Sequence, residues 1–316
     1  MADELPPEDG SPEPTARRRG FIFEILRARK AVLGLIILSV FVLVSVVAPL
    51  ISPYSAKAQT CEVYAPPSGS HWLGCDDGGV DMLSQLMQGG RISLTVGFAA
   101  ALVALVIGGV VGIVSGYFGG WFDSLLMRIT DYLLVIPDLV LMVVIAAVWG
   151  SSLWHIIIVI GCLSWTSNAR LIRAQVITLR ETGYVKRTRS VGATDLRIIG
   201  RHILPHVAPI LIATTVLTIA DAIYMESALA FLGLADPGAT TWGTILEHAF
   251  ERTAVSAGAW WAIVPVGLCL AAVVVGCYLV GQAFEDALNP RLKVGHLTTR
   301  SWRRARPSVG QGRTLA

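Results

Sequence analysis

Long runs without a charged residue constrain this chain more than any other feature of its sequence. Residues 31–51, 92–118 and 260–283 contain no Asp, Glu, Lys or Arg. About 20 apolar residues are enough for an α-helix to cross the hydrocarbon core of a bilayer. The sequence therefore predicts an all-α membrane protein with six transmembrane helices. The other three spans are apolar stretches interrupted by single polar groups, at roughly 124–148, 152–169 and 207–234.

The composition agrees with a membrane protein. Of the 316 residues, 54% are hydrophobic and 15% are charged, whereas about a quarter of the residues of a soluble domain are charged. The first apolar run is longer than the core of a signal peptide, and no small-residue cleavage site follows it. We therefore expect the first span to be retained.

The distribution of positive charge indicates how the spans are oriented. With six spans both termini lie on one side, and 22 of the 25 Lys and Arg fall on that side. Only Lys57, Arg91 and Arg252 fall on the opposite side. Because Lys and Arg concentrate in cytoplasmic segments, we expect both termini in the cytoplasm.

The two ends of the chain differ from its middle. Residues 1–16 are rich in Pro, Glu and Asp, which predicts a disordered tail. Residues 17–30 are basic with interleaved apolar side chains, as in an interfacial helix. Residues 294–316 are predicted to be a disordered basic tail beside anionic lipid. A nucleic-acid role for this tail has no other support, so no nucleic-acid partner is expected.

Between these ends, residues 31–293 form one predicted transmembrane domain. Two loops outside the membrane are long, at 52–91 and 235–259, and the second is expected to contain a short helix. We expect both loops on the extracytoplasmic side, and a basic segment at 180–206 on the cytoplasmic side.

Four acidic residues lie within or beside the apolar spans: Asp131, Asp138, Asp221 and Glu226. An ionisable group in a membrane helix is costly, so it normally faces protein or a water-filled cavity. We expect Asp138, Asp221 and especially Glu226 to line a transport pathway, and Asp131 to be structural. The alternative for each is a cap, a structural hydrogen bond or a position at the membrane interface.

Gly108, Gly112 and Gly116 are spaced four apart, so they share one face of the second span. Small residues at this spacing let a neighbouring helix approach closely. We expect them to serve packing inside the bundle, and the alternative is a dedicated dimer motif.

Motifs of catalysis and metal binding are missing from the sequence. It has no G-x-S-x-G elbow, no H-E-x-x-H and no Walker A loop, because none of the four Lys follows Gly or precedes Ser or Thr. His202 and His206 are separated by Pro205 and have no accompanying carboxylate, so no metal site is expected. The chain is predicted to be non-enzymatic, and any ATP that drives it must bind to another chain.

Two of the five cysteines, Cys61 and Cys75, lie in the 52–91 loop on the predicted oxidising side. Pro and Gly residues between them allow the chain to turn back, so a disulfide is predicted. The alternative is two unpaired thiols. Cys162, Cys269 and Cys277 lie within spans and are expected to be small apolar packing residues.

The stretch 183–209, GYVKRTRSVGATDLRIIGRHILPHVAP, is compact, basic and flanked by apolar sequence. Gly183 and Gly192 bracket residues 184–191, which can form two helical turns. By itself such a stretch can also be a loose basic loop on lipid headgroups.

A family resemblance depends first on residues of this stretch: Tyr184-Val185, Arg189, Gly192-Ala193, Asp195, Arg197-Ile198-Ile199 and Arg201-His202-Ile203-Leu204-Pro205. They resemble the cytoplasmic loop of ABC-importer permeases for dipeptides, oligopeptides and nickel, in particular the second of the two permease subunits (DppC/OppC-like). Further matches follow in order over roughly residues 20–293, at 71–94, 117–137, 226–243 and 286–292.

The resemblance implies a MetI-like permease architecture and a coupling helix that docks on an ATPase subunit. The residues it assigns to ATPase coupling are Tyr184, Lys186, Arg189, Gly192, Ile203, Leu204 and Pro205. The chain departs from the family at Lys186-Arg187-Thr188, where the family has Glu-Ala-Ala, so an acid at the ATPase contact is replaced by a base. We therefore expect Lys186 to meet an acidic patch on its partner.

The implied function is import of peptides or a similar small solute across the bacterial cytoplasmic membrane. The implied partners are a homologous second permease subunit, two ABC ATPases that bind ATP and Mg, and an extracytoplasmic binding protein; the chain itself needs no cofactor. Permeases for nickel, glutathione or short sugars share these motifs, so transport of one of these solutes remains an alternative. From other classes, a secondary transporter needs inverted repeats that the sequence does not show, and a membrane scaffold or receptor leaves the matched blocks unexplained.

Overall fold

The computed structural model describes residues 28–288. The predicted tails 1–16 and 294–316, and most of the predicted interfacial helix 17–30, lie outside the described residues. Residues 28–288 form helices and connecting loops, without a β-strand. The helices are, in chain order, α2 (Arg29–Ile51), α3 (Met82–Phe118), α4 (Gly120–Val135), α5 (Asp138–Trp149), α6 (Leu153–Arg180), α7 (Gly183–Ser190), α8 (Asp195–Ile198), the π-turn Ile199–Ile203, α9 (Leu204–Phe231), α10 (Trp242–Glu251), the 3-10 turn Trp260–Ala262 and α11 (Val264–Leu288).

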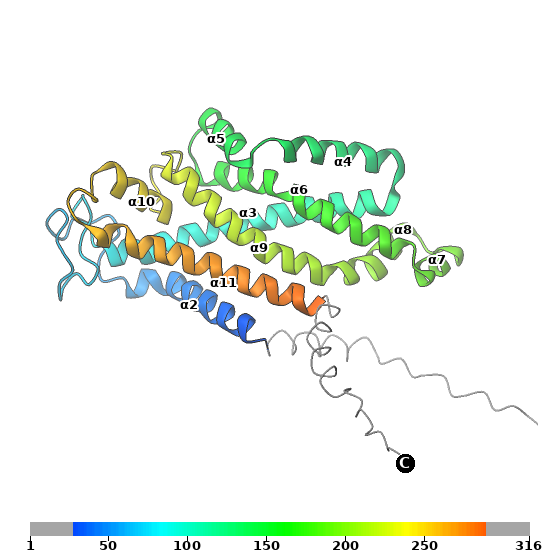
Figure 1. The fold of residues 1–316 in the computed structure, drawn as a ribbon, viewed down its shortest axis with the longest axis horizontal. Helices are drawn as coiled ribbons and strands as arrows, with labels where there is room; N and C mark the ends of the chain where they lie inside the picture. Colours follow the sequence, from blue (N-terminus) through cyan, green and yellow to red (C-terminus); the bar gives the residue numbers. More distant parts are fainter. Residues whose placement is uncertain (1–27, 289–316) are drawn as a thin grey trace, which may run out of the picture.

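The long helices lie side by side as one bundle (Figure 1). α3 packs along α6 and α9, α9 packs against α11, and α2 covers α11 and α3. Five helical segments among the described residues are long and apolar enough to cross a membrane, and counting α4 with α5 as one span makes six. The predicted number of spans therefore requires the α4–α5 pair to be a single crossing.

The third predicted span, 124–148, consists of two helices, α4 and α5, that are separated at Pro137. α4 and α5 meet at an angle of 89°. Pro137 has no backbone N–H and disfavours a helical conformation in the residue before it. Ile136 is accordingly extended, with ψ 131°, and α5 starts afresh at Asp138. The break places the carboxylate of Asp138 at the first turn of a new helix.

The second span is the longest helix of the bundle, and its start is defined by a cap. Asp81 is extended and accepts a hydrogen bond from the backbone N–H of Ser84 at 2.8 Å, which satisfies one of the free N–H groups of the first turn. α3 then continues for 37 residues to Gly119, whose φ of +68° suits glycine and ends the helix.

The glycine face of α3 lies directly against α6. A Cβ added at Gly108 comes within 2.8 Å of the carbonyl oxygen of Trp165, and one at Gly112 within 2.7 Å of that of Ala169. At Gly116 the nearest backbone atom, the Arg173 oxygen, is 2.9 Å away. The three glycines therefore lie where α3 and α6 approach each other closely.

The two long loops meet at the end of the bundle that carries α10, opposite the end that carries α7 (Figure 1). Lys57 Nζ donates to the oxygen of Gly238 at 2.9 Å, and the Tyr64 hydroxyl donates to the oxygen of Arg252 at 2.7 Å. The guanidinium of Arg252 pairs with Asp77. These contacts join the 52–81 segment to the α9–α11 connection as one layer.

Candidate functional site

An open polar cavity of about 350 Å³ lies between α5, α6, α9 and the last turn of α11. Its acidic side chains are exposed to it, and its floor is formed by buried hydroxyl and amide groups. No Lys or Arg among residues 28–288 lines it. The polar lining residues are Asp138, Ser164, Thr166, Ser167, Asn168, Thr214, Thr218, Asp221 and Glu285.

Two of the predicted pathway residues, Asp138 and Asp221, meet at this cavity. The Tyr278 hydroxyl of α11 donates to Asp221 Oδ1 at 3.0 Å. On the floor, Asn168 Nδ2 of α6 donates to the Thr218 hydroxyl of α9 at 3.1 Å. The acidic groups that line this cavity favour a cationic or hydrogen-bond-donating solute.

The third predicted pathway residue, Glu226, does not line the cavity. It is 1% exposed and accepts hydrogen bonds from the Ser93 hydroxyl at 3.1 Å and the Ser227 hydroxyl at 3.3 Å. Ser93 Oγ also accepts from the backbone N–H of Trp242 at 3.2 Å. Glu226 therefore connects α9, α3 and the start of α10, which is the structural hydrogen-bond alternative.

Asp131, expected to be structural, pairs with Arg170 of α6 at 2.7 Å, and both side chains are more than half exposed. A stronger link lies a few turns away, where Asp123 accepts from Arg173 Nε and Nη2 at 2.5 and 2.7 Å. A bidentate pair of this kind fixes geometry. It connects the exposed helix α4 to the bundle.

Two cavity residues, Glu285 and Asn168, could not be recognised from the sequence. Glu285 falls beyond the apolar run of the last span, and only the length of α11 brings it to the cavity. A usable signal did exist on α9, where Thr214, Thr218 and Asp221 recur at helical spacing and share one face.

The predicted coupling segment forms two short helices and a π-turn beside the C-terminal end of α3. Buried apolar side chains hold it to α3 and α6: Val185, Ile198, Ile203 and Val207 from the segment, against Tyr117, Ile172 and Val176. Gly192 separates α7 from α8 with φ +86°. Leu204, at the start of α9, is 43% exposed, so its side chain is only partly buried within the fold.

The basic residues of this segment divide into two groups. Lys186 Nζ pairs with Glu181 at 2.9 Å, and this hydrogen bond lowers the pKa of Glu181 below its ordinary value. Arg189 lies over the ring of Tyr117, 5.1 Å from its centroid, and the Tyr117 hydroxyl donates to Asp195 Oδ1 at 2.6 Å. The second group consists of Arg187, Arg197 and Arg201, which line an open groove of about 480 Å³.

His202 and His206, considered as metal ligands and rejected from sequence, are occupied otherwise. His206 Nδ1 is 2.8 Å from the carbonyl oxygen of His202, so this nitrogen donates to it. Both rings also lie beside Tyr184, with centroids about 6 Å apart.

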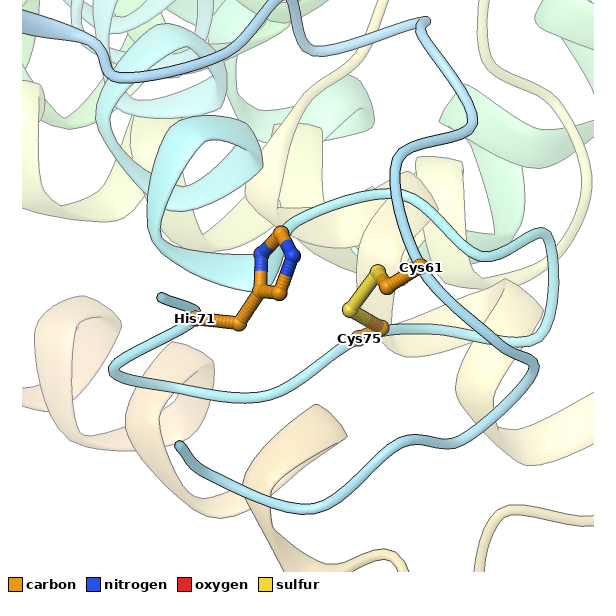
Figure 2. A group of neighbouring side chains, drawn as sticks. All are labelled: Cys61, His71 and Cys75. Carbon is orange, nitrogen blue, oxygen red and sulfur yellow. A yellow bond between two sulfur atoms is a disulfide. The ribbon is translucent and has the colours of Figure 1, made fainter. Parts of the chain in front are cut away.

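Cys61, His71 and Cys75 bring their side chains together in the 52–81 segment, with ligand atoms within 4.8 Å of one another (Figure 2). Cys61 and Cys75 form a disulfide, with Cα atoms 6.5 Å apart. His71 Nδ1 is 2.9 Å from Asp81 Oδ1, the carboxylate that also caps α3. Because a metal binds thiolates and not a disulfide, this group serves to fix the loop against the helix.

The disulfide leads to a first prediction. In the unreduced, denatured protein, Cys61 and Cys75 are expected to resist alkylation, while Cys162, Cys269 and Cys277 take up label. Closing a loop of about 15 residues stabilises the folded protein by about 3 kcal/mol in the chain-entropy model. Peptide mass spectrometry before and after reduction checks the pairing, and label on both thiols without reduction contradicts it.

Comparison with known proteins agrees with this architecture. The family described as binding-protein-dependent transport system inner membrane component matches residues 108–294, more than half of the chain. The N-terminal transmembrane domain of oligopeptide transport permease C matches residues 20–67. The chain belongs to the family of binding-protein-dependent transport system inner membrane components, the permease subunits of ABC transporters.

Its relatives are similar over nearly their whole length. The dipeptide transport system permease protein DppC of Alkalihalophilus pseudofirmus is 36% identical over 291 residues, which covers 91% of this chain and 94% of the relative. A relative from Brucella suis, named for a peptide transport system permease, is 35% identical over 282 residues, covering 89% and 92%. One from Brucella ovis, named for a peptide permease, is 32% identical over 296 residues, covering 93% and 96%.

Among solved structures, a chain of the MetNI methionine ABC transporter in an inward-facing conformation has the same fold. Its TM-score is 0.51 at 20% identity, and the match covers 65% of this chain and 95% of that chain. The predicted all-α permease architecture and the family resemblance are both confirmed.

Proposed function

We propose that this chain is one of the two permease subunits of an ATP-driven importer that carries di- or oligopeptides, or a similar small solute, across the bacterial cytoplasmic membrane. Two partner ATPases bind ATP and Mg, a homologous permease forms the other half of the pathway, and an extracytoplasmic binding protein delivers the solute. The names of the relatives support the peptide class. The chain itself binds no nucleotide and performs no chemistry.

The observation that carries the proposal is the polar cavity between α5, α6 and α9, with Asp138, Asp221 and Glu285 exposed to it. We infer that its open side faces the second permease, so that the complete pathway lies between the two subunits. A peptide presents an ammonium group and several N–H donors, which suit carboxylates and hydroxyls. Alternating access then exposes the cavity to each side of the membrane in turn.

Asp221→Asn tests the role of the cavity. Losing the charge-assisted hydrogen bond to a cationic group is expected to lower uptake of a dipeptide by about tenfold. Basal ATPase activity stays unchanged because the residue is remote from α7. Uptake into proteoliposomes that hold the full transporter, with ATP inside or outside, measures both.

Asp131→Asn is the matched control, because this carboxylate also lies in the membrane domain but pairs with Arg170 outside the cavity. It is expected to transport normally. Equal uptake by wild type and Asp221→Asn contradicts the pathway assignment. Uptake driven by an ion gradient without ATP contradicts the whole proposal in favour of a secondary transporter, and uptake of Ni²⁺ but no peptide selects the nickel permeases.

We further propose that the segment from α7 to the start of α9 is the coupling element that receives nucleotide-driven movement from an ATPase. Two exposed apolar side chains of this segment support the proposal, because a protein partner can bury them: Val191 is 87% exposed and Leu196 is 84% exposed. Lys186 already forms an ion pair with Glu181. We therefore propose that the groove of Arg187, Arg197 and Arg201, in place of Lys186, contacts the acidic surface of the partner. A base-rich groove fits an ATPase surface that carries Asp or Glu.

The proposed orientation leads to a labelling prediction. A cysteine introduced at Ser190, in α7, is expected to react only with reagents that enter the cytoplasm. A cysteine introduced at Ala239, in the α9–α10 connection, is expected to react with an impermeant maleimide added to intact cells. The protein without an added cysteine provides the background from native thiols. Reaction of the Ser190 variant from outside contradicts the six-span orientation.

A further inference from the structure

A second cavity, of about 630 Å³, opens between α2, α3 and α9 and does not belong to the proposed pathway. α9 contributes Thr215 and Ile219 to it, whereas Thr214, Thr218 and Asp221 line the polar cavity. The two cavities thus lie on different faces of α9, and a ligand in one does not compete with a solute in the other. We call this second cavity the α2–α3 groove.

The walls of the α2–α3 groove are apolar even where hydroxyl groups line them. Thr95 Oγ1 donates to the backbone oxygen of Arg91 at 2.6 Å, and Thr215 Oγ1 donates to that of Leu211 at 2.6 Å. Both hydroxyls are therefore satisfied within their own helices, which leaves few donors for a polar solute. Apart from Ser45 and Arg91, the rest of the wall is aliphatic or aromatic: Val42, Val46, Leu94, Phe98, Ala99, Leu102 and Ile219.

Among the residues that the structure describes, one charged side chain lines the α2–α3 groove, the exposed Arg91. It is the last residue before the apolar run 92–118, on the side of the bundle that carries α10. No carboxylate within the described residues forms an ion pair with it, whereas Arg170, Arg173, Arg180 and Arg252 each have one. A guanidinium at the boundary of the hydrocarbon region is costly unless an anion or water accompanies it.

We propose that the α2–α3 groove binds an anionic phospholipid, with its phosphate on Arg91 and an acyl chain between α2 and α9. The charge of Arg91 attracts an anion, and the apolar wall next to it suits a hydrocarbon chain. An anionic lipid combines both in one molecule at this depth. The groove also has a volume within the range of specific ligand sites.

The proposal predicts a preference that depends on one side chain. Full-length protein in mild detergent is titrated with phosphatidylglycerol, or with phosphatidylcholine of the same acyl chains, and bound lipid is counted by native mass spectrometry. Wild type is expected to retain phosphatidylglycerol preferentially. Arg91→Gln weakens its binding about fivefold, while Arg91→Lys keeps most of it, since one cation near a lipid surface contributes about that factor. Equal affinity of wild type for the two lipids, or of Arg91→Gln and wild type for phosphatidylglycerol, overturns the proposal.

The acyl-chain half of the site is tested separately. Ala99→Trp fills the α2–α3 groove and is expected to abolish retention of the bound phosphatidylglycerol. Leu268→Trp, at an exposed position of α11 outside the groove, is the control and retains it. If Ala99→Trp does not fold, a cysteine at Thr95 replaces it, because phosphatidylglycerol and not phosphatidylcholine then protects this thiol from maleimide. Cross-linking of that cysteine to the second permease subunit in the assembled transporter overturns the proposal, since protein then fills the groove.

Discussion

Replacing Gly192 by proline is expected to abolish transport while the protein still inserts into the membrane. Gly192 has φ +86°, and proline is restricted to φ near −65°, so the chain between α7 and α8 has to rearrange. The strain is about 3 kcal/mol or more. This strain distorts the connection that sets the angle between α7 and α9. Because the proposed coupling element is then misplaced, the ATPase is expected to hydrolyse ATP without solute stimulation.

The chain offers a matched control for this substitution. Gly183→Pro introduces the same residue nine positions earlier, at the first residue of α7, where proline is tolerated. The preceding residue, Thr182, is already extended with ψ 146°, as a residue before proline prefers. Uptake and solute-stimulated ATPase activity in proteoliposomes are expected to be near normal for Gly183→Pro. Normal uptake by Gly192→Pro contradicts a coupling role for this connection.

Gly112→Leu is expected to prevent assembly of the bundle. Even one added carbon lies 2.7 Å from the Ala169 oxygen and 2.8 Å from Ile172 Cβ, so α3 and α6 have to separate along their length. Overpacking of this kind costs about 1–3 kcal/mol or more, and here it meets backbone that cannot rotate away. The yield of monodisperse protein in mild detergent, and its Tm, measure the loss.

Gly267→Leu controls for the change of residue type. Gly267 also lies in a membrane helix, α11, but a Cβ added there has no atom within 4 Å. This variant is expected to be purified like wild type. If Gly112→Leu and Gly267→Leu behave alike, the glycine face does not set the distance between α3 and α6.

The features that sequence predicted best are those that depend on one helix at a time. Runs free of charge locate the spans, because crossing a bilayer is a requirement on length and polarity. The short helix α7 follows from its two bracketing glycines, Gly183 and Gly192. The bend at Pro137 is different, because a proline predicts a break without predicting an angle, and neighbours often restore a straight path.

The role of each acidic residue was less predictable, because hydropathy does not say which neighbour a side chain meets. Glu226 and Asp221 are five residues apart on α9, yet one is buried against Ser93 and the other is exposed to the cavity. Lys186 forms an ion pair with Glu181. Glu181 is close to it in sequence but lies outside the matched motif, from which a contact of Lys186 with a partner was predicted. Pairings between helices depend on packing, which single-helix patterns do not encode.

The unbroken course of α3 has a mechanical consequence. At about 1.5 Å per residue its 37 residues span about 55 Å. One end is anchored through Asp81 to His71 in the disulfide loop, and the other through Tyr117 to Asp195 in the α7–α9 segment. A helix without a proline or a bulge is stiff, so a tilt of about 5° at one end displaces the other by about 5 Å. In the proposed importer, movement of the α7–α9 segment would thus reach the loops at the other end of α3 through a single lever, without a relay of side chains.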